Sequence, residues 1–336
     1  MRSAGLPAAA TKTRVRGRIT AGWTARAAAW AALAVGGSGL VWVLDEYRRH
    51  VAILVVLYAV LALTWDIVAR TGQLSLAHAA FFGLGAYTSA LTYSRLGLAP
   101  LWSLVAGGVV AAAAAGGIGW LTLRLRGIHF AIATLAFGEV LKTAALQLRS
   151  LTNGAIGISV PPLFGGERVP AYYLVLGMLA VALAMSEGMQ SSRLRFALSA
   201  MRTNEEVARA TGVPAVAIKA GIFAASSFLV GVAGAFYLHY TTYIVPEEVF
   251  NLAVSVSALV MPILGGLYST AGPLIGAVAL KTLEEYLRVT ITYGYLIAYG
   301  LMLALAVLLM PRGLLGVWRA WRSSMSRGGA AASAGG

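Results

Sequence analysis

The sequence predicts an all-α membrane protein that crosses the bilayer many times, and three observations support this fold class. Only 11% of the 336 residues are charged, whereas soluble domains carry about 25% charged residues. Hydrophobic residues make up 59% of the chain, and its mean hydropathy is +0.78. These residues fall in long runs, many of them close to the about 20 residues that a membrane-spanning helix needs. This composition excludes a soluble enzyme.

Ten apolar runs follow one another along the chain. The first is longer than the apolar part of a signal peptide, so we expect an uncleaved span there. Two runs, 74–94 and 251–267, contain Gly, Pro or polar residues, and we expect broken or re-entrant helices in them. About ten transmembrane helices are therefore predicted, although eight are also compatible with the sequence. The runs are 27–44, 51–69, 74–94, 101–123, 128–148, 171–186, 215–240, 251–267, 271–287 and 293–310.

Basic residues orient the chain across the membrane. If the N-terminus is cytoplasmic, the inner segments carry 18 of the 26 Lys and Arg residues and the outer segments carry 6. Because cytoplasmic loops of membrane proteins are enriched in Lys and Arg, both termini are expected in the cytoplasm. The predicted organisation is a basic N-terminal segment (1–26), a transmembrane domain (27–318) with a cytoplasmic loop at 187–214, and a cytoplasmic tail (319–336) whose composition predicts disorder.

The cytoplasmic loop carries signals for the start and end of helices. Thr203 and Glu206 have the spacing of a capping box. Gly212 suits the position after a helix end, and Pro214 prevents the helix from continuing. Two short helices are therefore predicted, at about 192–202 and 204–211.

A short rigid helix at the membrane surface suits the docking of a cytosolic partner, and a solvated surface loop is the alternative. In the docking interpretation Glu205, Glu206 and Arg209 pair with charges of the partner, while Val207 and Ala208 pack. The residues assigned to this docking element are Leu198, Met201, Arg202, Thr203, Glu205, Glu206, Val207, Ala208, Arg209 and Gly212.

Several polar or small residues fall within the predicted spans. Asp66 and Arg70 are four residues apart, which lets them pair on one helix face. Glu139 lies near the middle of a span, where charge is costly unless it meets a partner or a cavity. A pair with Lys142 or a packed His78 would be purely structural, and a polar pathway is the functional alternative. Candidate pathway-lining residues are Gly72, His78, Phe82, Gly83, Gly85, Glu139, Pro262 and Gly265.

Five segments, in order along residues 50 to 318, resemble the branched-chain amino acid ABC permeases of LivM type. The cytoplasmic loop resembles the family's cytoplasmic loop, and the interrupted run at 74–94 resembles the segment after the family's second apolar run. The matching segments are Gly72–Tyr87, Arg126–Glu139, Thr152–Gly154, Leu198–Gly212 and Pro311–Gly316.

The resemblance implies a permease subunit of an ATP-driven importer in the inner membrane, which carries branched-chain or related amino acids into the cytoplasm. Relatives that carry urea or other small polar solutes are an alternative. The implied partners are a LivH-like second permease, two cytosolic ABC ATPases, an extracytoplasmic binding protein and the lipid bilayer. On the outer face, Thr152, Asn153, Gly154, Glu247 and Glu248 would lie where the binding protein docks.

No cofactor is expected on this chain, and several features exclude other functions. The chain lacks the Gly-x-x-x-x-Gly-Lys-[Ser/Thr] motif, so ATP and Mg²⁺ are expected on the partner ATPases. It contains no Cys and 4 His in separate segments, which argues against a metal site. The basic residues behind the net charge of +14 lie mainly in the predicted cytoplasmic segments, as expected for a membrane protein. Nucleic acid is therefore not an expected partner. A secondary transporter with ion sites at Asp66, His78 and Glu139 is the alternative from another class. An intramembrane enzyme is not favoured.

Overall fold

The computed structural model describes residues 36–39, 41–125 and 127–291, with scattered positions at Trp30 and between Gly294 and Gly316. The predicted N-terminal segment and C-terminal tail lie outside the described residues. Half of the first predicted run, 27–44, and most of the last, 293–310, lie outside them.

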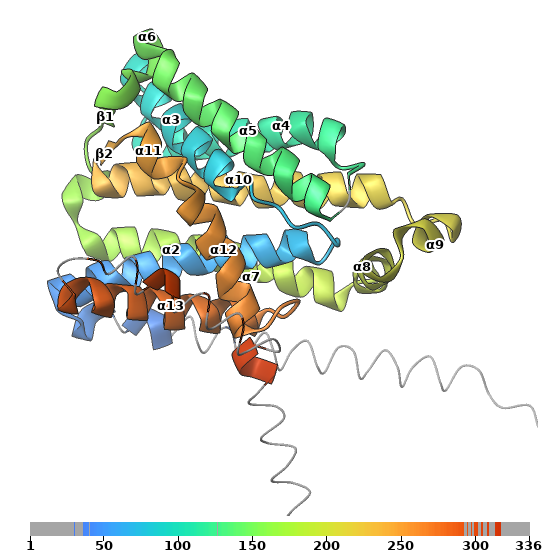
Figure 1. The fold of residues 1–336 in the computed structure, drawn as a ribbon. Helices are drawn as coiled ribbons and strands as arrows, with labels where there is room; N and C mark the ends of the chain where they lie inside the picture. The colour runs from blue at the N-terminus through green and yellow to red at the C-terminus, as the bar shows by residue number, and fades with distance from the viewer. Residues whose placement is uncertain are drawn as a thin grey trace, which may run out of the picture.

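Eight long helices occupy the eight other runs that the sequence predicts (Figure 1). Each begins and ends within a few residues of the predicted boundaries. They are α2 (Glu46–Ala69), α3 (His78–Leu96), α4 (Pro100–Thr122), α5 (Ile128–Gln147), α7 (Arg168–Ser191), α10 (Ala215–Thr241), α12 (Leu252–Gly265) and α13 (Ala271–Thr290).

Short elements connect these helices. In sequence order they are α6 (Arg149–Thr152), η1 (Gly154–Ile156), β1 (Ile158–Ser159), η2 (Leu163–Gly166), α8 (Leu194–Thr203), α9 (Glu205–Ala210), β2 (Tyr243–Ile244) and α11 (Pro246–Val249). The two strands pair antiparallel, with Ile158 opposite Ile244. This pairing ties the loop before α7 to the end of α10.

Six stretches of the described chain are long and apolar enough to cross a membrane: α2, α4, α5, α7, α10 and Pro246–Gly265. The chain is therefore a multi-pass helical membrane protein. The helices α3 and α13 are not among these six, since α3 is rich in Gly, Ser, Thr and Tyr and α13 carries four charged residues near its C-terminal end. The count of ten spans and the cytoplasmic placement of both termini stay predictions.

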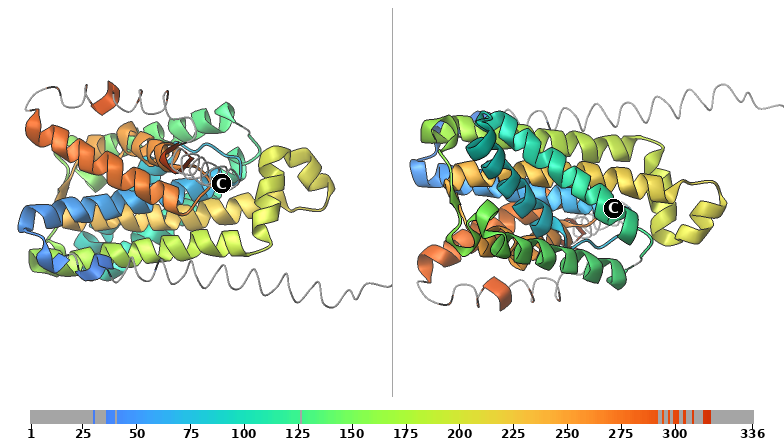
Figure 2. Two further views of the ribbon diagram at one scale, coloured as in Figure 1. Left: turned by 90° about the horizontal axis from the view of Figure 1, so that it is seen from below. Right: turned by 90° about the horizontal axis from the view of Figure 1, so that it is seen from above.

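The long helices lie side by side, and the short elements gather at the two ends of the bundle. The α8–α9 segment projects from one end, whereas α6, α11 and the two strands lie at the other (Figures 1 and 2). Every residue from Ala59 to Arg70 is buried, so the second half of α2 is the core of the bundle. It contacts α7, α10, α12 and α13.

Glycines bring α3, α4 and α10 into backbone contact. A Cβ added at Gly85 would lie 2.1 Å from the carbonyl oxygen of Gly231, and one at Gly107 would lie 2.6 Å from that of Gly85. Small residues allow this close approach, which favours helix association where no hydrophobic effect drives it. Any larger side chain at these positions would force the helices apart.

Both apolar runs that were expected to be interrupted contain an interruption. The chain turns at Gly72, where φ is +86°, and residues 73–77 are irregular before α3 begins. In the second case α12 continues past Pro262 to Gly265, and the helix ends at Gly266, where φ is +129°. Pro262 itself does not interrupt the helix, because α12 accommodates the proline three residues before its last residue, Gly265.

Candidate functional site

The α8–α9 segment contains the residues that the sequence assigns to docking. The helix α8 buries Leu198 and Met201, which are 5% and 4% exposed, and turns Phe196 outward. In α9 Ala208 is buried, and it forms a small apolar cluster with Met201 and Ala215 at the start of α10. This cluster fastens the segment to the bundle.

Asn204, rather than Thr203, caps the N-terminus of α9. The Asn204 Oδ1 atom accepts hydrogen bonds from the backbone N–H groups of Glu206 and Val207, at 3.0 and 3.2 Å. The Thr203 hydroxyl instead donates to the carbonyl of Ser199 at 3.0 Å. An N-cap needs an extended backbone, which Asn204 has, while Thr203 is the last residue of α8. The two predicted helices are confirmed, but the predicted cap is wrong.

The end of α9 has the geometry predicted from Gly212. This glycine has φ of +88°, and its N–H donates to the carbonyl of Arg209 at 2.9 Å. The N–H of Val213 donates to the carbonyl of Ala208 at 3.1 Å. These two hydrogen bonds form a Schellman motif, which ends the helix sharply before Pro214.

Glu205 forms ion pairs inside the chain. Its carboxylate contacts Lys219 at 2.8 Å and Arg209 at 2.5 Å. Burial raises the pKa of Glu205, but the hydrogen bonds and charges of Lys219 and Arg209 outweigh it, so the pKa lies below its usual value. Val207 is 59% exposed in this chain, so it packs on no other part of the bundle that the structure describes and stays a predicted contact for the partner.

Lys219 was not among the predicted site residues, although it is the only charge in the run 215–240. It is 3% exposed, and its ion pair with Glu205 fastens α9 to α10. A lone charge inside an apolar run was a signal that could have found it.

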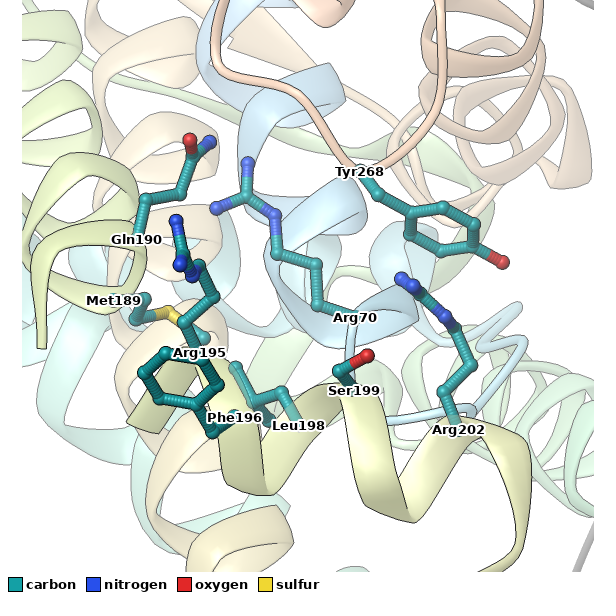
Figure 3. A pocket seen from close by; sticks show the side chains of 9 residues that line it. All are labelled: Arg70, Met189, Gln190, Arg195, Phe196, Leu198, Ser199, Arg202 and Tyr268. Atoms are coloured by element: carbon teal, nitrogen blue, oxygen red, sulfur yellow. The ribbon is translucent and has the colours of Figure 1, made fainter. Parts of the chain in front are cut away.

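Two cavities lie between parts of α8 and α9 and the ends of the long helices. One of about 420 Å³ lies between α8, the end of α7, Arg70 and Tyr268 (Figure 3). The other, of about 340 Å³, is lined by α9, Lys219 and the turn that contains Gly72. Arg202 lines both. A Cβ added at Gly72 would lie 3.6 Å from the Cα of Arg202, so this glycine faces α8.

The predicted Asp66–Arg70 pair is present and buried. Asp66 Oδ2 accepts from Arg70 Nε at 2.9 Å and from an Arg70 terminal nitrogen at 2.7 Å. Arg70 also donates to the hydroxyl and carbonyl oxygens of Ser186 in α7. Asp66 Oδ1 accepts from the backbone N–H of Tyr268 at 2.6 Å. The pair therefore joins α2 to α7 and to the turn before α13.

Side chains of three helices satisfy the irregular backbone at 73–77. Trp65 Nε1 donates to the carbonyl of Ser75 at 2.7 Å, and Thr134 Oγ1 accepts from Leu76 N–H at 3.0 Å. Ser255 Oγ donates to the carbonyl of Leu76 at 2.8 Å and accepts from the N–H of Ala79. Irregular backbone at membrane depth needs such partners.

The residues of α3 assigned to the pathway are buried against neighbouring helices. His78 is 2% exposed, and its Nε2 lies 3.5 Å from the Thr64 hydroxyl. The Phe82 ring packs on Tyr237. A Cβ added at Gly83 would lie 2.5 Å from the Phe250 ring. Gly85 contacts α10, as described above.

The other assigned pathway residues lie apart from this group. Pro262 is buried within α12, and a Cβ added at Gly265 would lie 1.7 Å from the carbonyl oxygen of Gly272. Glu139 lies on an exposed face of α5, with Lys142 at 3.7 Å. Among the described residues, no group of three His, Cys, Asp or Glu side chains could hold a metal ion.

The residues assigned to the binding protein gather at the end of the bundle opposite to α8 and α9 (Figure 1). Thr152 ends α6, where its hydroxyl donates to the carbonyl of Ala145. Asn153 and Gly154 follow in left-handed conformations. Glu247 and Glu248 are exposed on α11, which contacts η1. Glu248 accepts a hydrogen bond from the Tyr237 hydroxyl.

Residues 48–309 match the family model described as the permease component of the branched-chain amino acid transport system. The chain is 31% identical over 299 residues to the high-affinity branched-chain amino acid permease proteins LivM of Salmonella typhimurium and Escherichia coli K12, covering 80% of this chain and 70% of each relative.

It is also 25% identical over 284 residues to the permease protein LivH of Escherichia coli K12, covering 77% of this chain and 91% of the relative. No solved structure matches the chain. The matched residues include all eight long helices and the α8–α9 segment, apart from the first two residues of α2. The chain therefore belongs to the family of branched-chain amino acid transport permeases, and within it to the LivM type.

Proposed function

We propose that this chain is the membrane subunit of an ATP-driven importer that carries branched-chain amino acids into the cytoplasm. Its partners in this proposal are a LivH-like second permease, two cytosolic ATPases that bind ATP and Mg²⁺, and an extracytoplasmic binding protein. The observation that carries the proposal is the α8–α9 segment, a rigid helical unit at one end of a bundle that belongs to a permease family.

The construction of this segment suits the transmission of force. The helix α9 is closed by the Asn204 cap at its start and the Gly212 motif at its end, and the Glu205–Lys219 ion pair fastens it to α10. A segment held in this way moves as a unit when a partner pushes on it. Val207 and Arg209 are exposed and available to that partner.

The opposite end of the bundle suits the binding protein. In the proposed orientation α8 and α9 face the cytoplasm, so Thr152, Asn153, Gly154, Glu247 and Glu248 lie outside the inner membrane. The exposed carboxylate of Glu247 would meet basic residues of the binding protein.

The proposed route for the amino acid passes the irregular segment 73–77. Irregular backbone at membrane depth occurs where it is buried in protein or lines a cavity, and interrupted helices mark the binding region of many transporters. The residues proposed to line the route when it opens are Gly72, His78, Phe82, Gly83, Gly85, Glu139, Pro262 and Gly265.

Reconstitution with the partner chains tests the proposal. In liposomes that contain both permeases, the ATPases and the binding protein, leucine uptake should require ATP and should continue in the presence of a proton uncoupler. Uptake of urea instead of leucine would change the proposed substrate. Uphill uptake by this chain alone, driven by an ion gradient, would contradict the proposal and support a secondary transporter.

A further inference from the structure

The aromatic side chain of Tyr268 connects α8 to the turn between α12 and α13. The guanidinium of Arg202, at the end of α8, lies 4.0 Å from the ring centroid of Tyr268. Figure 3 shows both side chains reaching toward each other across one side of the 420 Å³ cavity. A guanidinium over a tyrosine ring is attracted by the ring's quadrupole. This contact ties the position of α8 to the position of the turn.

The backbone of Tyr268 is held in a costly conformation. Its φ is +60°, in the left-handed region that residues with a side chain rarely adopt. Its N–H donates to Asp66 Oδ1 at 2.6 Å. Strained backbone of this kind persists only where its surroundings fix it, and it is common in switch regions. Tyr268 is thus anchored by the Asp66 carboxylate on one side and faces Arg202 on the other.

The anchor extends from Asp66 into two more helices. Asp66 pairs with Arg70, which donates to the Ser186 hydroxyl at 2.8 Å. The Ser186 hydroxyl lies 2.8 Å from the Thr270 hydroxyl, two residues after Tyr268. The hydrogen bonds therefore form a closed ring through α2, α7 and the turn. Asp66 and Arg70 are 0% and 4% exposed, so water competes little for these bonds.

The cavity removes close packing on one side of the contact between Arg202 and Tyr268, while α8 also packs on the bundle through Leu198 and Met201. It separates α8 from Arg70, Gln190 and the turn, and all of these line it. Close-packed interiors pass displacements through many contacts at once, whereas a cavity removes them. Movement of α8 toward the bundle would then reach the turn through the ring of Tyr268.

We propose that Tyr268 is a positioning residue that passes the movement of α8 to α2 and α13 through the Asp66 carboxylate. This inference rests on the proposed function, because it supposes that a cytosolic ATPase moves α8. It goes beyond that function by naming the residue through which ATP hydrolysis is coupled to transport.

The test compares Tyr268→Leu with Tyr268→Phe in the reconstituted complex. Leu removes the aromatic face, while Phe keeps it and removes only a hydroxyl that makes no hydrogen bond to the described residues. For Tyr268→Leu, leucine transported per ATP hydrolysed should fall by about fivefold or more, the lower range of coupling between sites. ATP hydrolysis should stay within about twofold of wild type. Tyr268→Phe should match wild type in both.

Arg202→Gln gives an independent measurement, because Arg202 lies on a surface helix and its loss should not prevent folding. Its transport per ATP should fall like that of Tyr268→Leu, and the double variant should be no worse than either single variant. Three results would overturn the inference. They are additive losses of transport per ATP in the double variant, an unchanged transport per ATP in both single variants, and failure of Arg202→Gln to retain the ATPases. Absence of ATP-driven uptake by the wild-type complex would instead overturn the proposed function, and this inference with it.

Discussion

Glu205 and Lys219 show how single residues hold a surface segment in place. Both side chains are at least nine-tenths buried, and each satisfies the charge of the other. Removal of one partner leaves a buried, uncompensated charge. The free-energy cost of that charge exceeds the net stabilisation that the intact pair provides. The pair therefore fixes α9 on α10 more than it stabilises the whole chain.

Glu205→Gln should loosen α9 from α10, because it leaves the Lys219 charge buried with only a neutral acceptor. The expected loss of local stability is roughly 2–3 kcal/mol, at or just below the lower end for a broken buried pair. Hydrogen–deuterium exchange of residues 205–212 measures it. Glu206→Gln is the matched control, because Glu206 is exposed. Equal exchange in the two variants would contradict the role of the pair.

The lowered pKa of Glu205 also predicts a pH dependence. Because the folded protein holds the carboxylate more tightly ionised than the unfolded chain, the pair stabilises α9 above the unfolded pKa of about 4.3. This contribution is lost as the pH falls below that value through the folded pKa. Exchange at 205–212, corrected for its intrinsic pH dependence, should be constant from pH 7 to about 5 and should rise below about pH 4. Glu205→Gln should abolish the rise.

Residue spacing predicted the Asp66–Arg70 ion pair but could not predict the contact between Asp66 and Tyr268. The interval of four between Asp66 and Arg70 indicates a pair on one helix face. Tyr268 is 202 residues from Asp66 in sequence and contacts it through a backbone N–H. Sequence patterns reflect side chains, and this contact is made by the backbone of Tyr268. It could therefore be found only in the structure.

At the scale of elements, glycine contacts determine which helices touch. Gly85 should be intolerant of any side chain, because a Cβ there would meet the Gly231 carbonyl at 2.1 Å. Gly85→Ala should therefore lower the thermal unfolding temperature and the yield in detergent. Gly177→Ala in α7 is the matched control, since a Cβ there meets nothing within 4 Å, and alanine should be neutral or stabilising in a helix. Equal losses in both variants would contradict the close contact.

The sequence predicted the existence of the helices better than their interruptions. Apolar runs identified all eight long helices of the described residues, because bilayer thickness sets a length that composition reveals. Within the run 251–267 the helix continues through Pro262 and ends at Gly265, since a proline near the end of a helix does not have to break it. A glycine in the sequence indicates close packing but does not identify the helix that it contacts. The grouping of α3, α4 and α10 could therefore not be predicted.

At the scale of the molecule, the two ends of the bundle should face opposite sides of the membrane. The chain contains no Cys, so single cysteines can report their location without background. Val207→Cys should react with a membrane-impermeant maleimide only from the cytoplasmic side, and Glu247→Cys only from the outer side. Both positions are exposed. Labelling of both from one side would contradict the proposed orientation.

The glycine contacts also join five of the long helices into two groups, α3 with α4 and α10, and α12 with α13. A Cβ at Gly276 in α13 would lie 1.8 Å from the Met261 carbonyl oxygen in α12, much as α3, α4 and α10 touch at Gly85, Gly107 and Gly231. Where main chains touch, no layer of side chains can change rotamer to absorb a shift. We expect each group to move as a rigid body relative to the other. The helix α2 lies between them, since it contacts members of both.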